Sequence, residues 1–357
     1  MKFVRVFASL CVVAIATLTS ASPATAPPPH NGCKNPTIRR EWRTLSNSQK
    51  NNYLNAVKCL MRNDGRLNGT VTRYEDFLTT HQRLTSQIHF NGVFLPWHRL
   101  FVHTMEKILI EECGYRGAMP YWDMKRDAAD FAASPVLNGP FSFGGNGAPN
   151  PDEVAPYYPS AGGPIMRGPF ANEIIHIGVG TDTGPARRRI KRNIAQFFAD
   201  MWLRPEREAQ VLAETDFDSF SLILEGRVQL DFVLNSDQWG MHAGGHRAIG
   251  GDMVDAWTSP SDPLFYMHHS NLDRIWATWQ KANPERQFLV GGPIKPRSPL
   301  LGPWPYPPPP GNVTLGYVMT LNGLGPDTAV GRVVDTMGKA PAGSPSGILC
   351  YQYDSLL

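Results

Sequence analysis

Several stretches of the chain carry apolar residues three and four positions apart, the spacing that puts them on one face of a helix. Ser46 can cap the first of these stretches, and Gly114 can end the third. The pattern predicts helices at about 39–62, 74–86, 96–112, 241–248 and 263–281, and mostly helical chain over 186–225 with a break at Arg204-Pro205.

Glycine and proline dominate two of the remaining stretches, and such composition is typical of irregular loops. These loops are expected at 131–169 and 284–310. Short strands are expected at 317–321 and 331–337, where β-prone residues stand between turn residues. The predicted fold class is therefore mainly α, a helix bundle with long Pro/Gly-rich loops and a few short strands.

Charge adds little to this picture. The formal net charge of +3 is small, and no dense basic run accompanies a base-stacking motif, so nucleic-acid binding is not expected. We interpret the basic run from Arg187 to Arg192 as the solvated face of a helix. Beyond the first 21 residues no stretch approaches the roughly 18 apolar residues of a membrane span, so no membrane partner is expected.

The start of the chain resembles a secretory signal. Lys2 and Arg5 precede an apolar core, and small residues end the segment at about position 21. We therefore expect residues 1–21 to be removed, and residues 22–357 to form a single secreted domain. Asn68 and Asn312 each begin a glycosylation sequon in turn-like surroundings, which suits a secreted protein.

Four cysteines remain once the signal is removed, and an even number in an oxidising compartment predicts two disulfides. Three pairings of four cysteines exist. We favour Cys33–Cys350, which would tie the two ends together, with Cys59–Cys113, whose members each follow a helical segment.

Histidines carry the candidate chemistry. Eight of the ten histidines fall in two compact clusters, and His242 and His246 are four residues apart, so that they share a helix face. Neutral imidazole suits copper, zinc, iron and nickel, and three imidazoles leave a metal an open coordination position. The six candidate ligands form two groups of three: His81, His89 and His98, then His242, His246 and His269. Spacing alone does not name the metal.

Two motifs around these histidines are similar to known copper signatures. They read His89-x4-Phe94-Leu95-x-Trp97-His98-Arg99 with Glu106, and Asp262-Pro263-x-Phe265-Tyr266-x2-His269-x3-Asp273. Both resemble, with the same internal spacing, the signatures of tyrosinases, catechol oxidases and molluscan haemocyanins. The resemblance covers about residues 33–353 and is nearest to the short secreted fungal members.

The resemblance implies two copper ions in a coupled type 3 site that binds O2. By matching position, copper A would take His81, His89 and His98, and copper B would take His242, His246 and His269. Because each half places a histidine on each of two helices, four helices are expected to hold the metal pair.

Other residues of the signatures are expected to surround the ligands. Asp273 and Glu106 can hold the second ring nitrogen of ligating histidines, with Arg99 and Arg274 balancing their charge. His268 is placed beside the site, because the second histidine of the pair fits the signature. The resemblance also places Phe265 beneath the copper pair, where it can stack with an aromatic substrate; a plain core role fits equally.

The family implies oxidation of o-diphenols to o-quinones with O2, so the expected partners are a small phenol and O2. Strong monophenolases often carry Asn directly after the first copper B histidine, where this chain has Ala243. No carboxylate stands nine residues before His242, where Val233 lies. We therefore favour a catechol oxidase-like activity. A true tyrosinase, an o-aminophenol oxidase and a haemocyanin-like O2 carrier are the alternatives.

Three further features bear on substrate access and on closure of the domain. Arg247 can steer acidic or phenolate substrates, and Ala256 would leave an open entrance. The glycines at 244 and 245 suggest close approach of backbone or substrate between two ligands. The Tyr351-Gln352-Tyr353 motif resembles the one that closes the family's core domain on an arginine, here Arg39 or Arg40, and no C-terminal lid domain is expected after it.

Overall fold

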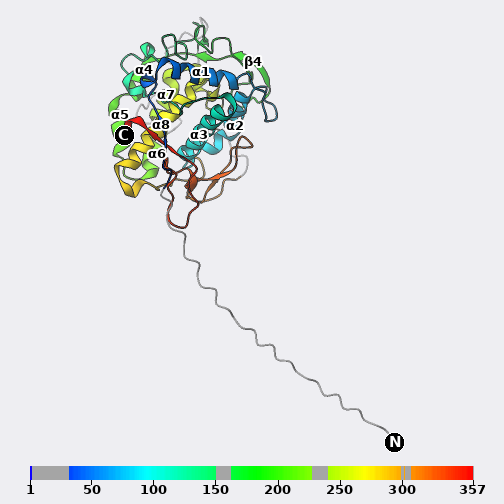
Figure 1. Cartoon of the computed structure of the whole chain (residues 1–357), viewed down its shortest axis with the longest axis vertical. Coiled ribbons are helices and arrows are strands. Elements are labelled where there is room, and N and C mark those ends of the chain that lie inside the picture. The colour runs from blue at the N-terminus through cyan, green and yellow to red at the C-terminus, as the bar shows by residue number, and fades with distance from the viewer. Residues whose placement is uncertain (2–31, 150–161, 227–239, 299–300, 302–306, 357) are drawn as a thin grey trace.

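The computed structural model describes residues 1, 32–149, 162–226, 240–298, 301 and 307–356 of the 357-residue chain. The predicted signal segment and Val233 lie outside the described residues. The fold is mainly helical, as predicted (Figure 1). Its helices are α1 Asn47–Leu60, α2 Arg73–Ile88, α3 Phe94–Cys113, α4 Gln196–Trp202, α5 Pro205–Ala213, α6 Phe217–Glu225, α7 Met241–Ile249 and α8 Leu264–Ala282.

The strands are short and form two-stranded pairs. They are β1 Thr37–Arg39, β2 Gly163–Pro164, β3 Ile174–Ile177, β4 Pro185–Arg189, β5 Lys191–Arg192, β6 Val318–Met319, β7 Thr328–Ala329 and β8 Tyr351–Tyr353. The pairs are β1 with β8 in parallel, and β2 with β5, β3 with β4 and β6 with β7 in antiparallel. None of the helices in the described part of the chain combines the length and hydrophobicity needed to cross a bilayer.

Capping residues decide where the first two helices begin. Ser46 and Gln49 form a capping box at the start of α1, and Thr72 and Glu75 form another at the start of α2. The prediction that the first helix begins at about residue 39 was therefore wrong, because residues 37–39 are extended and pair with the C-terminal strand. Gly114 ends α3 with a left-handed φ of 62°, as expected.

Two other expectations were wrong in secondary structure. The basic run from Arg187 to Arg192 lies on β4 and β5 and not on a helix, and Arg192 is fully buried in an ion pair with Asp262. Arg188 and Arg192 pair with the buried carboxylates of Asp252 and Asp262, whereas Arg187 and Lys191 are exposed. The segment 331–337 forms no strand; β6 pairs instead with residues 328–329, and a 3-10 turn follows at Val330–Arg332.

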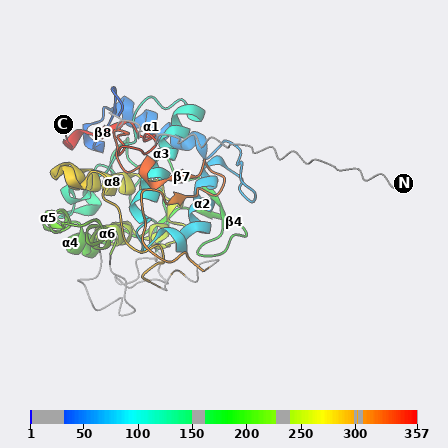
Figure 2. The same ribbon diagram turned by 90° about the horizontal axis from the view of Figure 1, so that it is seen from below.

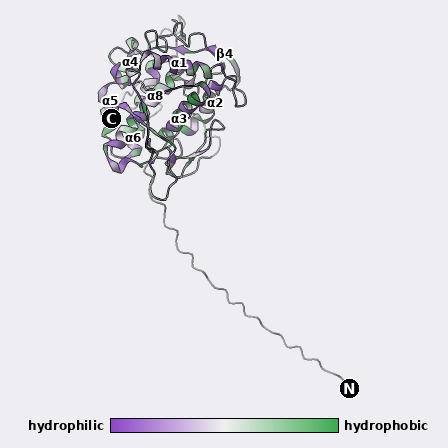
Figure 3. Cartoon of the chain, in the orientation of Figure 1, coloured by the Kyte–Doolittle hydropathy of each residue, from purple (hydrophilic) through white to green (hydrophobic). Residues whose placement is uncertain are grey.

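The central helices pack around one large apolar cluster. α3 packs against α8 and α1, and α2 lies beside α3 (Figure 1). Hydrophobic residues gather on α2 and α3 near the middle of the molecule (Figure 3). A second cluster joins α6 to α8 around Phe220, Trp276 and Trp279. These contacts hold α2, α3 and α8, three of the four helices that carry the candidate ligands, in fixed register.

A buried ionic network lies beside β1 and β8, which pair in parallel although they are more than 300 positions apart in sequence. β8 lies near the C-terminus and next to α1 (Figure 2). Arg39 bonds to Glu106 of α3, to Asp273 of α8 at 3.2 Å and to the Tyr353 hydroxyl at 3.1 Å. Tyr351 and Tyr353 each donate to Asp273 at 2.6 Å. Burial alone would raise the pKa of Asp273, but the nearby arginines hold it below its ordinary value. Arg39, and not Arg40, is thus the arginine bound by the Tyr-x-Tyr motif.

The disulfides join the same regions covalently. Cys33 pairs with Cys350 across 317 positions of sequence, and Cys59 of α1 pairs with Cys113 at the end of α3. The predicted pairing is confirmed. Because each bond closes a long loop, each restricts the unfolded chain and stabilises the fold by several kcal/mol in the chain-entropy model, on the order of 3–5 kcal/mol.

Replacing Asp273 should show how much the network contributes. Asp273→Ala removes the carboxylate that pairs with both Arg39 and Arg99 and leaves these buried charges uncompensated. The free energy of unfolding should therefore fall by about 3–5 kcal/mol. Urea denaturation of both proteins measures this. The control is Glu111→Ala, which removes an exposed i,i+4 pair with Lys107 and should change stability by less than about 0.5 kcal/mol. Equal, small effects would contradict a structural role for the network.

Candidate metal centre

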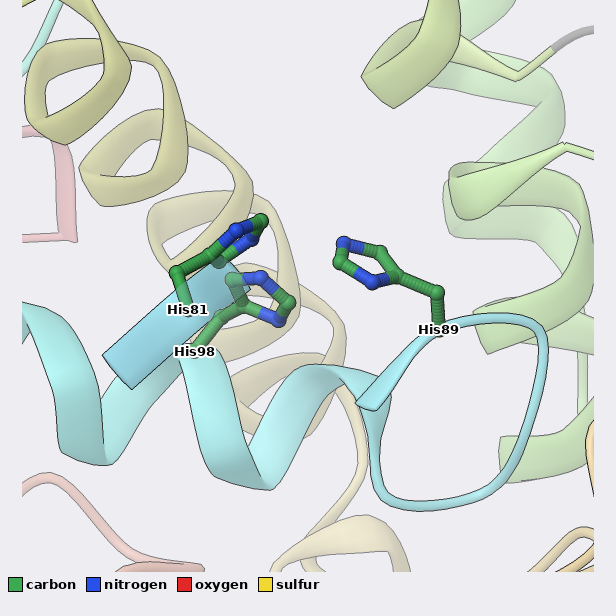
Figure 4. Close-up of side chains that lie close together, drawn as sticks. All are labelled: His81, His89 and His98. Atoms are coloured by element: carbon green, nitrogen blue, oxygen red, sulfur yellow. The ribbon is translucent and has the colours of Figure 1, made fainter. Parts of the chain in front are cut away.

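Six histidines converge from four helices, as predicted, and one loop end. His81 lies on α2, His98 on α3, His242 and His246 on α7, and His269 on α8, whereas His89 follows the last residue of α2. In each predicted group of three, one ring nitrogen of every histidine lies within 4.8 Å of the others. Figure 4 shows His89 reaching from its loop toward His81 and His98. All six side chains are buried.

The two groups lie directly against each other. The rings of His98 and His269 stack with their centroids 4.4 Å apart, and His89 and His242 stack at 5.9 Å. Within the second group, His246 Nε2 and His269 Nε2 are 3.2 Å apart, close enough to share one metal ion. The arrangement can therefore place two metal ions side by side, which lets a small molecule lie between them.

Backbone carbonyls fix the ring orientations of four of these histidines. The Nδ1 atoms of His89 and His98 bond to carbonyls one helical turn earlier, of Thr85 at 2.9 Å and Phe94 at 2.8 Å. His81 Nδ1 bonds to the Trp257 carbonyl at 2.9 Å, and His246 Nδ1 to the Met253 carbonyl at 2.7 Å. A carbonyl only accepts, so Nδ1 carries the proton in these rings and Nε2 is left as the metal-binding atom.

The free nitrogens fit a metal. His81 Nε2, His98 Nε2 and both ring nitrogens of His242 are buried without a hydrogen-bond partner among the residues that the structure describes. Buried polar atoms are normally paired, so unpaired imidazole nitrogens that face one another are what metal ligation would satisfy. Burial lowers the pKa of His89 to about 4 and holds the pKa of each of the other five well below the ordinary value, which keeps the rings neutral at pH 7.

Comparison with known proteins agrees with this geometry. Residues 71–282, which include all six histidines, match the family described as the common central domain of tyrosinase. The chain belongs to the tyrosinase family.

Relatives support the same assignment to the type 3 copper oxidases. The chain is 32% identical to tyrosinase ustQ of Aspergillus flavus, over 99% of this chain and 90% of that protein. It is 30% identical to N-acetyl-6-hydroxytryptophan oxidase of Emericella nidulans, over 90% of this chain and 93% of the relative. A polyphenol oxidase structure from Thermothelomyces thermophila superposes with a TM-score of 0.70 at 31% identity, covering 89% of this chain and 88% of that one.

The carboxylates expected beside the ligands lie elsewhere in this tyrosinase-family protein. Asp273 and Glu106 bond to Arg39 and not to any of the six histidines. Arg99 does pair with Asp273, but Arg274 bonds to Glu208 at 2.8 Å. The prediction that these acids orient ligands was wrong, because backbone carbonyls take that role while the acids neutralise buried arginines.

His268 and Phe265 do lie against the ligands. His268 Nε2 lies 3.0 Å from the His242 carbonyl, and its ring runs parallel to that of His242 at 5.9 Å. Phe265 is fully buried and stacks on His269 with centroids 4.1 Å apart, within 5.2 Å of His81. Both residues therefore restrict the movement of the ligand rings.

The two glycines of α7 are explained by close packing, as expected, but side chains make the approach. A Cβ on Gly244 would lie 2.3 Å from the Trp202 Cβ of α4, and one on Gly245 would lie 2.4 Å from the His268 ring. Neither distance leaves room for a side chain. The two glycines thus allow α7, which carries His242 and His246, to pack closely against Trp202 of α4 and His268 of α8.

Sequence reasoning missed a buried carboxyl group beside His89. Glu225, at the end of α6, accepts the Phe90 N–H at 2.7 Å, and Phe90 has a left-handed φ of 56°. Burial raises the pKa of Glu225 well above that of an ordinary carboxyl group. A left-handed non-glycine residue is unfavourable by about 1 kcal/mol or more, so the backbone next to His89 needs such support. Only the Glu225-Gly226 turn was visible in the sequence.

The residues expected at the substrate side are half-buried. Ala243, Arg247 and Ala256 are each partly accessible, and burial lowers the pKa of Arg247 to about 9. These positions follow ligands on α7 or lie in the segment after it. They are compatible with a route for substrate to the histidines.

Adding one methyl group at Gly245 tests the close packing of α7. Gly245→Ala should lower the free energy of unfolding by about 1–3 kcal/mol because His268 cannot move away freely. It should also lower the copper bound per chain, since His242 and His246 flank this position. Gly291→Ala, where a Cβ meets no atom within 4 Å, is the control. Chemical denaturation and metal analysis measure both effects; a Gly245 variant that behaves like the control would contradict the packing argument.

Proposed function

We propose that this protein oxidises o-diphenols to o-quinones with O2, using two copper ions held by the six histidines. The observation that carries this proposal is the pair of buried histidine groups, in each of which one ring nitrogen of every histidine lies within 4.8 Å of the others, with rings of the two groups stacked on each other. An all-imidazole donor set suits copper, and three ligands per metal leave positions for O2. Membership of the tyrosinase family favours copper over zinc, iron and nickel.

Each residue then has a definite task. His81, His89 and His98 would hold one copper, and His242, His246 and His269 the other. The carbonyls of Trp257, Thr85, Phe94 and Met253 keep the protons of four rings on Nδ1, so that the ligating nitrogens stay free. When bound, the copper pair would supply O2 binding and accept two electrons from each diphenol, so two diphenols and one O2 give two quinones and two waters.

The walls of the site confine the substrate. Phe265 is a fully buried apolar ring stacked on His269, so it would exclude water from that side of the ligands. Ala243 presents only a methyl group beside His242, so no side-chain amide stands there to position a water for phenol deprotonation. We therefore infer that o-diphenols are oxidised faster than monophenols. Tyrosinase and o-aminophenol oxidase activities are the alternatives, and a haemocyanin-like carrier would bind O2 without turnover.

We also propose that the chain is a secreted, glycosylated protein whose described residues form one domain. Two disulfides suit an oxidising compartment. Asn68 and Asn312 are both exposed, so the two sequons are accessible for glycosylation. The pairing of β1 with β8 and the bond between Cys33 and Cys350 support a single closed domain.

Oxygen uptake by the copper-loaded protein tests the proposal. We expect rapid uptake with catechol, and uptake with tyrosine at least about tenfold slower, equivalent to about 1.4 kcal/mol in the barrier. Ala243→Asn should raise the tyrosine-to-catechol rate ratio, whereas Ala209→Asn, at an exposed position of α5, should leave it unchanged. o-Aminophenol is the third substrate.

Equal rates with tyrosine and catechol would contradict the substrate preference but keep the oxidase. Reversible O2 binding without turnover of any of the three substrates would overturn the oxidase in favour of a carrier.

A further inference from the structure

One short segment supplies carbonyls to both histidine groups. Residues 252–257, here called the bridging segment, follow α7 and include part of the 3-10 helix Gly251–Val254. The Met253 carbonyl accepts from His246 Nδ1 at 2.7 Å, and the Trp257 carbonyl accepts from His81 Nδ1 at 2.9 Å. A shift of this segment would therefore turn one ligand of each proposed copper site.

The β3–β4 hairpin holds the bridging segment at two points. Asp255 Oδ2 accepts the Gly180 N–H of the hairpin turn at 2.7 Å, while its Oδ1 accepts the N–H groups of Trp257 and Thr258 at 2.9 Å. Arg188 of β4 donates to Asp252 Oδ2 at 2.7 Å. Each anchor lies one or two residues from a carbonyl that orients a histidine.

The same hairpin holds α2 on the other side of His81. Gln82, the residue after His81, donates from Nε2 to the carbonyls of Gly180 and Asp182, both at 2.9 Å. Glu75 at the start of α2 accepts from the backbone and ring of His176 on β3 at 2.6 and 2.9 Å. Gln82 and Glu75 are buried, so these bonds are protected from water.

We propose that the β3–β4 hairpin is a positioning element for both copper sites, and that Gln82, Asp255 and Arg188 are its positioning residues. Gln82 and Asp255 act on His81, one through the α2 backbone and the other through the Trp257 carbonyl. Arg188 acts on His246 through Asp252 and the Met253 carbonyl. The contacts that orient a metal-bound imidazole also set its basicity, and losing one typically lowers metal affinity about 10–100-fold. The inference rests on copper binding as in the proposed function.

Asp255→Asn is the sharpest test, because one amide oxygen can still accept from Trp257 and Thr258 while the amide NH2 faces the Gly180 N–H. Gln82→Met removes the hydrogen bonds from α2 to the hairpin carbonyls of Gly180 and Asp182, and it leaves the contacts of the bridging segment unchanged. Each variant should bind the copper held by His81 about 10–100-fold more weakly, with the His246 copper retained. Arg188→Met should weaken the His246 copper instead.

Competition with a chromophoric copper(I) chelator measures the two affinities. Electron paramagnetic resonance of the oxidised, half-loaded protein then gives the signal of a single copper(II) ion, and its parameters should differ between the Asp255 and Arg188 variants. Asp216→Asn is the matched control, because Asp216 also accepts a backbone N–H, from Ser219, but caps α6. The Asp216→Asn variant should bind copper at both sites with the wild-type affinity.

The inference would be overturned if Asp255→Asn and Gln82→Met bound copper at both sites with wild-type affinity and lost only thermal stability. The hairpin would then be a structural element and not a positioning element. The same holds if all three variants lose both copper ions to equal extents. A wild-type protein that binds no copper would instead overturn the proposed function, and this inference with it.

Discussion

The hydrogen bond from imidazole Nδ1 to a backbone carbonyl is the interaction on which the metal centre depends. Four of the six rings make it, and each bond settles where the proton lies and which way the ring faces. Two of the four carbonyls belong to the turn that carries the histidine itself, so α2 and α3 orient His89 and His98 locally. The other two come from the segment after α7, so those rings depend on tertiary structure.

Burying these polar side chains is unfavourable in free energy unless the polar groups around them have hydrogen-bond or charge partners. Opposite charges pair in the buried network of Arg39, Arg99, Glu106 and Asp273, and none of these four residues bonds to a ligand histidine. Apolar rings such as Phe265 and small residues such as Gly244 and Gly245 fill the space between the helices. The ligands thus lie in a neutral, closely packed interior that favours the unprotonated ligating nitrogen.

The sequence revealed what depends on local pattern. Three local features could be recognised in the sequence: the spacing of His242 and His246, the two signatures around His98 and His269, and the caps at Ser46 and Gly114. The helices that carry the ligands were predicted from them. The backbone carbonyls that accept from the ligand histidines could not be predicted, because the carbonyls of Met253 and Trp257 leave no pattern in the side-chain sequence. Asp273 was misjudged for a related reason: its partner Arg39 is 234 positions away, and only the folded chain brings the two together. The basic run at Arg188 and Arg192 was misjudged because its buried partners, Asp252 and Asp262, are 64 and 70 positions away in sequence.

We propose that six neutral imidazoles hold two copper ions close enough to act as a pair. Electron paramagnetic resonance of the protein loaded with copper(II), combined with metal analysis, tests it most directly. We expect two copper ions per chain and almost no resonance signal, because the spins of a bridged pair cancel. One copper per chain, or two with the full signal of independent ions, would contradict it.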